Sequence, residues 1–483
     1  MNYKAVLNIL GRILQVEAAL MLLPVTVALI YKEDPVYFLI VIAALLLCGT
    51  LLAVLTKTKG NGKKIFAREG FLIVALSWLF MSVFGCLPFV ISKTIPSFVD
   101  AFFETVSGFT TTGASVLSGL DGMMKSMLFW RSFTHWIGGM GVLVFIMAVL
   151  PMANSRSVHI MRAETTGPTK GGKLVPKMRS TATILYAIYF GLTLTEVILL
   201  LIGGMNLFEA LTYSFGTAGT GGFAISDAGI AGFDSDYILA VIGVFMFLFG
   251  VNFNIYYAVL LGNFKEFFKN EENRWYMSIV GGSTLLITLN VMSLFANFGK
   301  ALLTSFFNVS SIMTTTGFTI VDFTQWPNFS QYILVVLMLC GACAGSTCGG
   351  IKMSRLVIVY KTIKRNIKSM LRPNQVEVIR LNGVVLDEAS VRSTQNFFCI
   401  FILLLIASAF FVSLDGYDFT TSVTATISCL CNIGPGLSLV GPSGNFAIFS
   451  DPVKLLLVFD MLMGRLELYP ILMLFIPAAW RRR

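Results

Sequence analysis

The sequence predicts an all-α polytopic membrane protein with ten transmembrane helices, arranged as an N-terminal helix pair followed by four parallel repeats. Three observations predict this fold class. Only 12% of the 483 residues are charged and 56% are hydrophobic, whereas a soluble domain has about 25% charged residues. Many charge-free runs reach the roughly 20 residues that a helix needs to cross a bilayer. One short glycine-containing pattern also recurs four times, which indicates internal repeats.

Ten stretches are predicted to span the membrane. Six have no charged side chain over 20 or more residues, and four contain a few polar residues. The first six are residues 36–56, 71–91, 238–263, 275–299, 332–351 and 393–414, and the other four are residues 5–30, 128–150, 182–204 and 455–476. The first stretch of all lacks a small-residue cleavage site before Tyr31, so we expect a retained helix rather than a signal peptide.

The basic residues fall mainly on one side of these spans. When the loops are assigned alternately to two faces, 28 of the 35 Lys and Arg residues lie on the face that holds both termini. By the positive-inside rule this face is cytoplasmic, so we expect both termini in the cytoplasm. Membrane topology therefore explains the net charge of +10, and we expect no nucleic-acid partner.

The eight cysteines lie within or beside apolar segments, so we expect no disulfide framework. Cys340 and Cys343 match the C-x-x-C pattern, but a zinc site needs further ligands, and the two histidines are the distant His135 and His159. We therefore expect no zinc or redox centre and no organic cofactor in this chain.

The repeats are four shorter segments of moderate hydropathy, each of which ends in a stretch rich in Gly, Thr or both. They are residues 102–113, 211–222, 306–317 and 423–434. The first and third are identical at seven of twelve positions, and the closing glycines are 109, 95 and 117 residues apart. Their length is typical of re-entrant helices that do not cross the bilayer.

This order of elements predicts the organisation of the chain. Each short segment lies between two spans, so successive units have the same orientation, unlike the inverted repeats of many secondary transporters. We expect an N-terminal helix pair at 1–66 and pore repeats at 67–155, 156–265, 266–375 and 376–483. Four parallel units are typical of a ring around one axis.

A ring of such loops favours a pore for a monovalent cation. Irregular backbone at membrane depth persists only where it is buried in protein or lines a watery path, and rings of backbone carbonyls replace the hydration shell of K⁺ in channels. Glycine adopts the dihedral angles that a filter strand needs, and the C-terminal end of each short helix favours a cation. The alternative for any single loop is close helix packing through small residues, which does not readily explain four similar loops.

The same residues resemble a known family. The stretches TTTGA at 110–114, GGF at 221–223, TTTGFT at 314–319 and NIGPG at 432–436 are similar to the filter loops of the Trk/Ktr/HKT potassium transporter superfamily, and within it to the TrkH/TrkG type. Supporting stretches are REGFLIV at 68–74, DAFFE at 100–104, WIGGMG at 136–141, GST at 345–347 and GRLE at 464–467. The resemblance extends over nearly the whole chain, including the additional N-terminal helix pair.

The resemblance implies the pore-forming subunit of a potassium uptake system in a bacterial inner membrane. It also implies a homodimer in contact with membrane lipid, and gating by a cytoplasmic nucleotide-binding subunit of the TrkA type. K⁺ would be both the transported and the bound ion, held at a selectivity filter. The implied filter residues are Thr111, Thr112, Gly113, Thr220, Gly221, Gly222, Thr315, Thr316, Gly317, Asn432, Ile433 and Gly434. The fourth loop departs from the Thr-rich pattern, so the ring is at best pseudo-symmetric.

A gate is predicted in the third repeat. Small residues occupy eight of the ten positions from 341 to 350, and glycine costs a helix about 1 kcal/mol relative to alanine, so we expect the span to break there. The resemblance makes this segment an intramembrane gating loop that contains Gly345, Ser346 and Thr347. Arg465, a charge inside a predicted span, is placed by the resemblance beside the permeation path, and the alternative is an interhelical salt bridge.

Three classes of function remain to be separated. A cation channel or uptake system fits the four parallel loops best, with a less selective K⁺/Na⁺ transporter or an ion-coupled symporter of the same architecture as variants. A secondary transporter of organic solutes would favour inverted repeats. An enzyme would need clustered acidic or histidine side chains, which the spans lack, so we expect none. The basic stretch 352–392 indicates a docking surface for the regulatory subunit or, alternatively, for anionic lipid headgroups.

Overall fold

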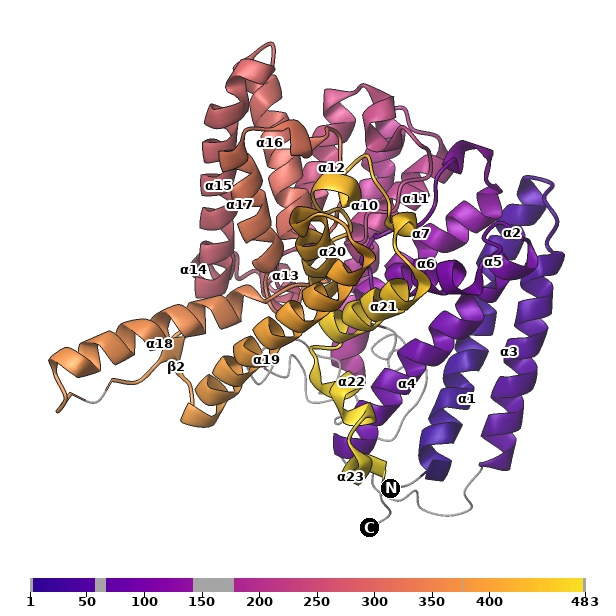
Figure 1. Cartoon of the computed structure of the whole chain (residues 1–483), viewed down its shortest axis with the longest axis horizontal. Coiled ribbons are helices and arrows are strands. Elements are labelled where there is room, and N and C mark those ends of the chain that lie inside the picture. The colour runs from indigo at the N-terminus through magenta and orange to yellow at the C-terminus, as the bar shows by residue number, and fades with distance from the viewer. Residues whose placement is uncertain (1–2, 57–66, 142–177, 376, 481–483) are drawn as a thin grey trace.

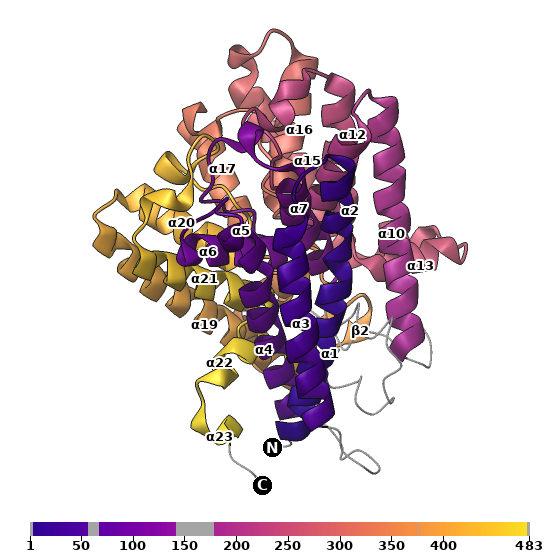
Figure 2. The ribbon, with the colours of Figure 1, turned by 90° about the vertical axis from the view of Figure 1, so that its right-hand side faces the viewer.

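The computed structural model describes residues 3–56, 67–141, 178–375 and 377–480, and these residues form helices with one small β-hairpin. The hairpin consists of β1 (Arg380–Leu381) and β2 (Val384–Val385), paired antiparallel. Part of the predicted span 128–150, from residue 142 onward, lies outside the described residues, as do all the basic residues between 57 and 66 and between 156 and 177. Figures 1 and 2 show the arrangement of the helices from two directions.

Six described helices are long and apolar enough to cross a membrane. They are Tyr3–Ile30, Val36–Leu55, Arg68–Ile91, Thr181–Ile202, Glu271–Leu294 and Glu388–Asp415. The first two form the N-terminal pair, and the other four open the four repeats. The expectation of an all-α membrane protein is thereby confirmed.

The N-terminal pair consists of α1 (Tyr3–Leu20), its continuation α2 (Leu22–Ile30) and α3 (Val36–Leu55). Helices α1 and α3 lie side by side, and α1 also packs against α4 (Ala67–Gly85), as Figure 1 shows. A Cβ atom on Gly11 would lie 2.7 Å from the carbonyl oxygen of Gly49, and the reverse distance is the same. Two glycines therefore allow the backbones of this pair to approach closely, as small residues do in membranes.

The same order of elements occurs four times after this pair: a long helix, a short helix, a loop and a closing helix, which is broken in the last three repeats. In the first two repeats the elements are α4 with α5 (Leu87–Ile91), then α6 (Phe98–Phe109) and α7 (Lys125–Gly139); and α10 (Met178–Ile202), α11 (Leu207–Gly219), α12 (Asp236–Phe249) and α13 (Phe253–Leu260). In the last two they are α15 (Glu271–Val291), α16 (Phe298–Met313), α17 (Asn328–Leu339) and α18 (Met353–Leu371); and α19 (Glu388–Val412), α20 (Phe419–Cys431), α21 (Asp451–Arg465) and α22 (Tyr469–Leu474). Short helices α14 (Lys265–Lys269) and α23 (Pro477–Trp480) follow the second and fourth repeats.

The last helix is interrupted in the second, third and fourth repeats. Helices α12 and α13 meet at an angle of 95°, and a loop from residue 340 to residue 352 separates α17 from α18. Helix α21 ends at Arg465, and Leu468 with φ +69° precedes α22. The predicted break in the third repeat is confirmed, and the predicted spans 238–263 and 455–476 contain breaks that the sequence did not predict.

The repeats form a closed cycle around the four short helices. The closing helix of each repeat packs against the short helix of the next: α7 on α11, α12 on α16, α17 on α20 and, completing the cycle, α21 on α6. Each short helix begins at a side-chain cap, formed by Ser97, Asn206, Asn297 and Asp418, which satisfies one N–H group at the helix start. The packing therefore brings the C-terminal ends of the four short helices to a common centre.

Candidate functional site

The four short helices end in the same way. In each, two main-chain N–H groups fold back onto carbonyls of the last turn, five and three residues earlier, which is a Schellman motif. The longer of these bonds are Thr112 N to Ser107 O, Gly221 N to Gly216 O, Thr316 N to Ser311 O and Ile433 N to Ser428 O, at 2.8 to 2.9 Å. Four identical helix ends give the four following loops the same starting direction.

The residue that reverses the chain at these ends is in the left-handed region, although it is not glycine. It is Thr111, Thr220, Thr315 and Asn432 in the four repeats, with φ between 55° and 57°. A left-handed residue with a side chain costs of the order of 1–3 kcal/mol and persists only where its surroundings fix it. Asparagine tolerates this conformation best, which explains why the fourth loop accepts Asn432 at this position.

A second left-handed residue follows two positions later in every loop, and here it is glycine. The φ angles are +80° at Gly113, +71° at Gly222, +79° at Gly317 and +104° at Gly434. All twelve residues predicted for the filter thus lie in four short segments with one repeated conformation. That they bind K⁺ stays a prediction.

These glycines link the loops into a ring. A Cβ atom on Gly113 would lie 2.0 Å from the carbonyl oxygen of Gly221, one on Gly222 would lie 2.0 Å from that of Thr316, and one on Gly317 would lie 2.0 Å from that of Ile433. The cycle closes at Gly434, whose Cβ would lie 2.9 Å from the carbonyl oxygen of Thr112. Each glycine therefore leaves room for the carbonyl that precedes the glycine of the next repeat, and a side chain at any of them would collide with it.

Threonine hydroxyls support the ring from behind. The hydroxyls of Thr110 and Thr112 lie 2.8 Å apart, and those of Thr314 and Thr316 have the same separation. In the fourth loop Asn432 donates from Nδ2 to the hydroxyl of Thr112 at 2.9 Å and to the carbonyl of Met461 at 2.9 Å. Its amide therefore connects the fourth loop to the first, in place of the threonine that the sequence lacks there.

The interrupted helix of the third repeat supplies a loop from residue 340 to residue 352 that lies against this ring. The main-chain N–H of Gly349 donates to the hydroxyl of Thr315 at 2.7 Å, and a Cβ on Gly349 would lie 2.5 Å from the carbonyl oxygen of Cys431. The loop that the sequence predicts as a gate therefore contacts the third and fourth ring segments directly. We call residues 340–352 the intramembrane loop.

The intramembrane loop is also fastened to the bend of the second repeat. Cys343 N donates to the carbonyl of Gly250 at 3.1 Å, and Phe253 N donates to that of Gly345 at 3.0 Å. Gly345 has φ +72°, and Ser346 donates from its hydroxyl to the carbonyl of Cys343 at 2.7 Å. These bonds occupy the main-chain groups that the 95° bend removes from α12 and α13, so the two interruptions satisfy each other.

Glu272 connects the intramembrane loop to the first turn of α18. Its Oε1 accepts the main-chain N–H of Ala344 at 2.6 Å and that of Ser354 at 3.0 Å. The side chain is 4% exposed, and hydrogen bonds to a carboxylate are about twice as strong as neutral ones. The preceding residue, Glu271, instead forms a half-exposed salt bridge with Lys361, so two neighbouring glutamates have different roles.

Arg465 joins α21 to the end of α7 and to the intramembrane loop. Its Nη1 donates to the carbonyl of Thr347 at 2.8 Å, and its Nη2 donates to those of Gly138 and, at 2.7 Å, Gly139. The latter two carbonyls end α7, where the helix dipole is negative. The structure thus brings together Arg465 and Thr347 of the predicted gate and gives the arginine main-chain partners, while Glu467 pairs with Arg355.

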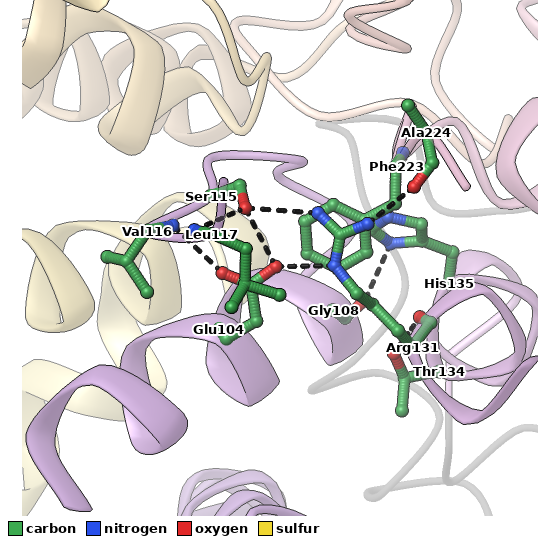
Figure 3. A network of polar contacts seen from close by, with 10 residues as sticks. All are labelled: Glu104, Gly108, Ser115, Val116, Leu117, Arg131, Thr134, His135, Phe223 and Ala224. Atoms are coloured by element: carbon green, nitrogen blue, oxygen red, sulfur yellow. Dashed lines mark hydrogen bonds and ion pairs between the residues drawn. The ribbon is translucent and has the colours of Figure 1, made fainter. Parts of the chain in front are cut away.

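A polar network behind the first two loops was not predicted as a site. It consists of Glu104, Arg131, Ser115 and His135, with main-chain groups of both loops (Figure 3). Arg131 and Glu104 are 3% and 1% exposed. The signal in the sequence was a carboxylate inside a short apolar segment, 27 residues before a basic residue in a predicted span.

Comparisons with known proteins agree with this architecture. The family described as "Cation transport protein", TrkH, matches residues 36–482. The Trk system potassium uptake protein TrkH of Escherichia coli K12 is 35% identical over 489 residues, which is all of both chains, and the Trk system potassium uptake protein TrkG of the same organism is 31% identical over 483 residues, 99% of each chain.

A solved structure gives the same result. The crystal structure of the potassium transporter TrkH from Vibrio parahaemolyticus matches with a TM-score of 0.88 and 32% sequence identity over the whole of both chains. The family resemblance that the loop motifs indicate is therefore confirmed, as is the helical membrane fold. This chain belongs to the TrkH family of cation transport proteins.

Proposed function

We propose that this chain is the pore-forming subunit of a potassium uptake system and that it conducts K⁺ through the ring of four loops. The observation that carries the proposal is the cyclic contact between the four glycines and the carbonyls of the neighbouring loops. Carbonyl rings are the means by which a channel replaces the hydration shell of K⁺. The names of the relatives, which are potassium uptake proteins and a potassium transporter, support the same ion.

The repeats at 67–155, 156–265, 266–375 and 376–483 would each contribute one quarter of the filter. The coordinating carbonyls are those next to Gly113, Gly222, Gly317 and Gly434. The dipoles of α6, α11, α16 and α20 end at the ring and favour a cation there without any acidic side chain. Selective passage of K⁺ over Na⁺ then depends on how firmly the four loops are held.

The intramembrane loop and Arg465 would close the pore. Arg465 places a permanent positive charge at the ends of α7 and the intramembrane loop, and such a charge raises the free energy of a passing cation. Conduction would require the intramembrane loop, with Gly345, Ser346 and Thr347, to move away from Arg465. A cytoplasmic nucleotide-binding subunit of the TrkA type would control this movement.

The docking surface for that subunit would be the cytoplasmic stretch 352–392. Helix α18 carries Lys361, Lys364, Arg365 and Lys368 and extends away from the rest of the molecule together with the hairpin (Figure 1). The same helix exposes Ile363, Ile367 and Met370 by 54%, 55% and 82%, a stripe that fits either the membrane interface or the second copy of a homodimer. The chain would reside in a bacterial inner membrane with both termini in the cytoplasm.

Rubidium uptake into proteoliposomes tests the proposed function. Rb⁺ flux down its gradient, with Na⁺ as competitor, is compared between the unmodified chain, Gly317→Ala and the matched control Gly281→Ala. A Cβ on Gly317 meets the carbonyl of Ile433 at 2.0 Å, whereas one on Gly281 of α15 meets no atom within 4 Å. We expect flux that Na⁺ competes with weakly, abolished by Gly317→Ala alone. Equal Rb⁺ flux in all three proteins would overturn the proposal. If none of the three takes up Rb⁺, the assay is repeated with the TrkA-type subunit present.

A further inference from the structure

The network in Figure 3 joins the segments that leave the ring in the first and second repeats. Glu104 lies in α6, nine residues before Gly113. Its Oε1 accepts the hydroxyl of Ser115 and its Oε2 accepts the main-chain N–H of Val116, both at 3.0 Å. The carboxylate therefore holds the chain two and three residues beyond the ring glycine of the first loop.

Arg131 extends this hold to the second loop. From α7 its Nε donates to Oε1 of Glu104 at 2.5 Å, while Nη1 donates to the carbonyl of Ala224 at 2.6 Å. Ala224 lies two residues beyond Gly222, the equivalent place in the second loop to that of Ser115 in the first. The guanidinium also stacks on the ring of Phe223 at 3.6 Å. One side chain thus connects corresponding positions of two adjacent loops.

His135, one helical turn after Arg131, makes a second connection between the same loops. Its Nδ1 contacts the carbonyl of Gly108 at 2.9 Å, and its Nε2 accepts the N–H of Phe223 at 3.3 Å. The second contact requires a lone pair on Nε2, so Nδ1 carries the proton and the imidazole is neutral. A Cβ on Gly221 would lie 2.2 Å from Nδ1, so the imidazole sits directly behind the second loop.

The ion pair needs an explanation other than stability. Burying two charges is offset only by excellent geometry and further hydrogen bonds, and such pairs often contribute little net stability compared with apolar residues. Among the salt bridges of the described residues, the pair of Glu104 and Arg131 is the most deeply buried, with both side chains 3% exposed or less. The planar fork of arginine, however, fixes the relative position of several acceptors at once, and here those acceptors belong to two neighbouring ring segments.

We infer that Glu104, Arg131 and His135 form a clamp that fixes the spacing between the first and second loops. The clamp thereby determines how well the ring distinguishes K⁺ from Na⁺ where these two loops meet. The inference rests on the proposed function of the ring as a K⁺ filter. A filter distinguishes K⁺ from Na⁺ only if its carbonyls cannot close around the smaller ion. Between the fourth and first loops the described contacts include the amide of Asn432 on Thr112 and the main-chain N–H of Phe446 on the carbonyl of Ser115, at 2.9 and 2.8 Å. Both contacts are between neutral groups, whereas the first and second loops are joined by a buried ion pair.

The test separates specificity from folding and from flux itself. Arg131→Lys keeps the charge beside Glu104 but loses the fork that reaches both Ser115 and Ala224, and uptake of Rb⁺ and Na⁺ is measured separately in proteoliposomes. The matched control is Asp100→Asn, which breaks the ion pair of the same helix α6 with Lys454 at its far end. We expect the Rb⁺ to Na⁺ uptake ratio to fall about tenfold in Arg131→Lys, the size of effect of one lost charged hydrogen bond, and to change less than about twofold in the control.

Other outcomes have defined meanings. If the unmodified chain takes up no Rb⁺ even with its regulatory subunit, the proposed function fails and the clamp fails with it. If the unmodified chain is selective and Arg131→Lys retains the same ratio at any total flux, the clamp alone is overturned. Should Arg131→Lys not fold, the paired variant Glu104→Met/Arg131→Met removes both buried charges together, and an unchanged ratio in this folded variant would overturn the inference equally.

Discussion

The Nη1 atom of Arg465 donates a hydrogen bond of 2.8 Å to the carbonyl oxygen of Thr347, which connects the interrupted helix of the last repeat to the intramembrane loop of the third. The same guanidinium reaches the end of α7 at Gly139. One cation from α21 therefore binds carbonyls of the intramembrane loop and of the end of α7. This arrangement explains how a charge is tolerated at membrane depth.

Replacing Arg465 by alanine should raise basal Rb⁺ flux several-fold without the regulatory subunit. The substitution removes both the positive charge and the ties to Thr347 and Gly139, so the intramembrane loop leaves its closed position more often. Arg465→Lys keeps the charge but cannot span all three carbonyls, and we expect an intermediate flux. Basal flux at the unmodified level in a folded Arg465→Ala protein would contradict this role.

Glu272→Ala should also open the gate. The carboxylate accepts the N–H groups of Ala344 and Ser354, and leaving buried donors unsatisfied costs about 1–3 kcal/mol each, which weakens the closed position of the intramembrane loop. We expect basal flux to rise roughly tenfold. Two thiols report the movement, because Cys343 and Cys348 are 0% and 2% exposed and should react faster with a water-soluble maleimide when the loop opens.

Glu271→Gln is the matched control for this experiment. Glu271 is adjacent in the sequence but contacts Lys361 on the surface, so the variant should retain unmodified flux and unmodified thiol reactivity. A faster reaction of Cys343 and Cys348 in Glu271→Gln, or none in Glu272→Ala, would show that Glu272 does not hold the intramembrane loop.

The contact between Thr315 and Gly349 should couple the gate to the ring. Thr315→Val has nearly the same shape but removes the acceptor of the Gly349 N–H, while Thr315→Ser keeps it. We expect Thr315→Val to raise basal flux by roughly fivefold or more, given the cost of an unsatisfied buried N–H, and Thr315→Ser to behave like the unmodified chain. Identical fluxes in the two variants would argue against coupling through this hydroxyl.

Acid should weaken the start of α20 in a way that depends on Asp418. The Thr421 hydroxyl that donates to this carboxylate, together with the Thr421 N–H, lowers the pKa of Asp418 below its ordinary value of 3.8. A lowered pKa in the folded state gives stability that is present above the unfolded pKa and is lost as the pH falls towards the folded pKa. The Tm of the detergent-solubilised protein should therefore drop more steeply between pH 5 and 3 in the unmodified chain than in Asp418→Asn, and parallel slopes would contradict this.

Much of the architecture could be predicted because it depends on local patterns. The charge-free stretches locate the long helices, and the four recurrent segments locate Gly113, Gly222, Gly317 and Gly434, since no other residue fits their backbone. The break in the third repeat could be predicted for the same reason, because a run of small residues makes a poor helix.

Other features depend on tertiary contacts that a local pattern does not contain. The bend after Phe249 lies in an apolar stretch that favours a continuous helix, and it exists because the intramembrane loop satisfies Gly250 and Phe253. The partners of Arg465 are main-chain carbonyls, which carry no signal in a side-chain pattern. Glu104 and Arg131 are 27 residues apart on different helices, so their pairing became evident only in the fold.

The most direct measurement of the central claim is the position of a bound ion. Crystals of the protein grown with Rb⁺ in place of K⁺ would be measured at the rubidium absorption edge, where anomalous scattering locates this ion unambiguously. The claim predicts a peak on the axis between the carbonyl oxygens of Thr112, Gly221, Thr316 and Ile433, which disappears when Na⁺ replaces Rb⁺. An anomalous peak elsewhere with none in the ring would contradict it.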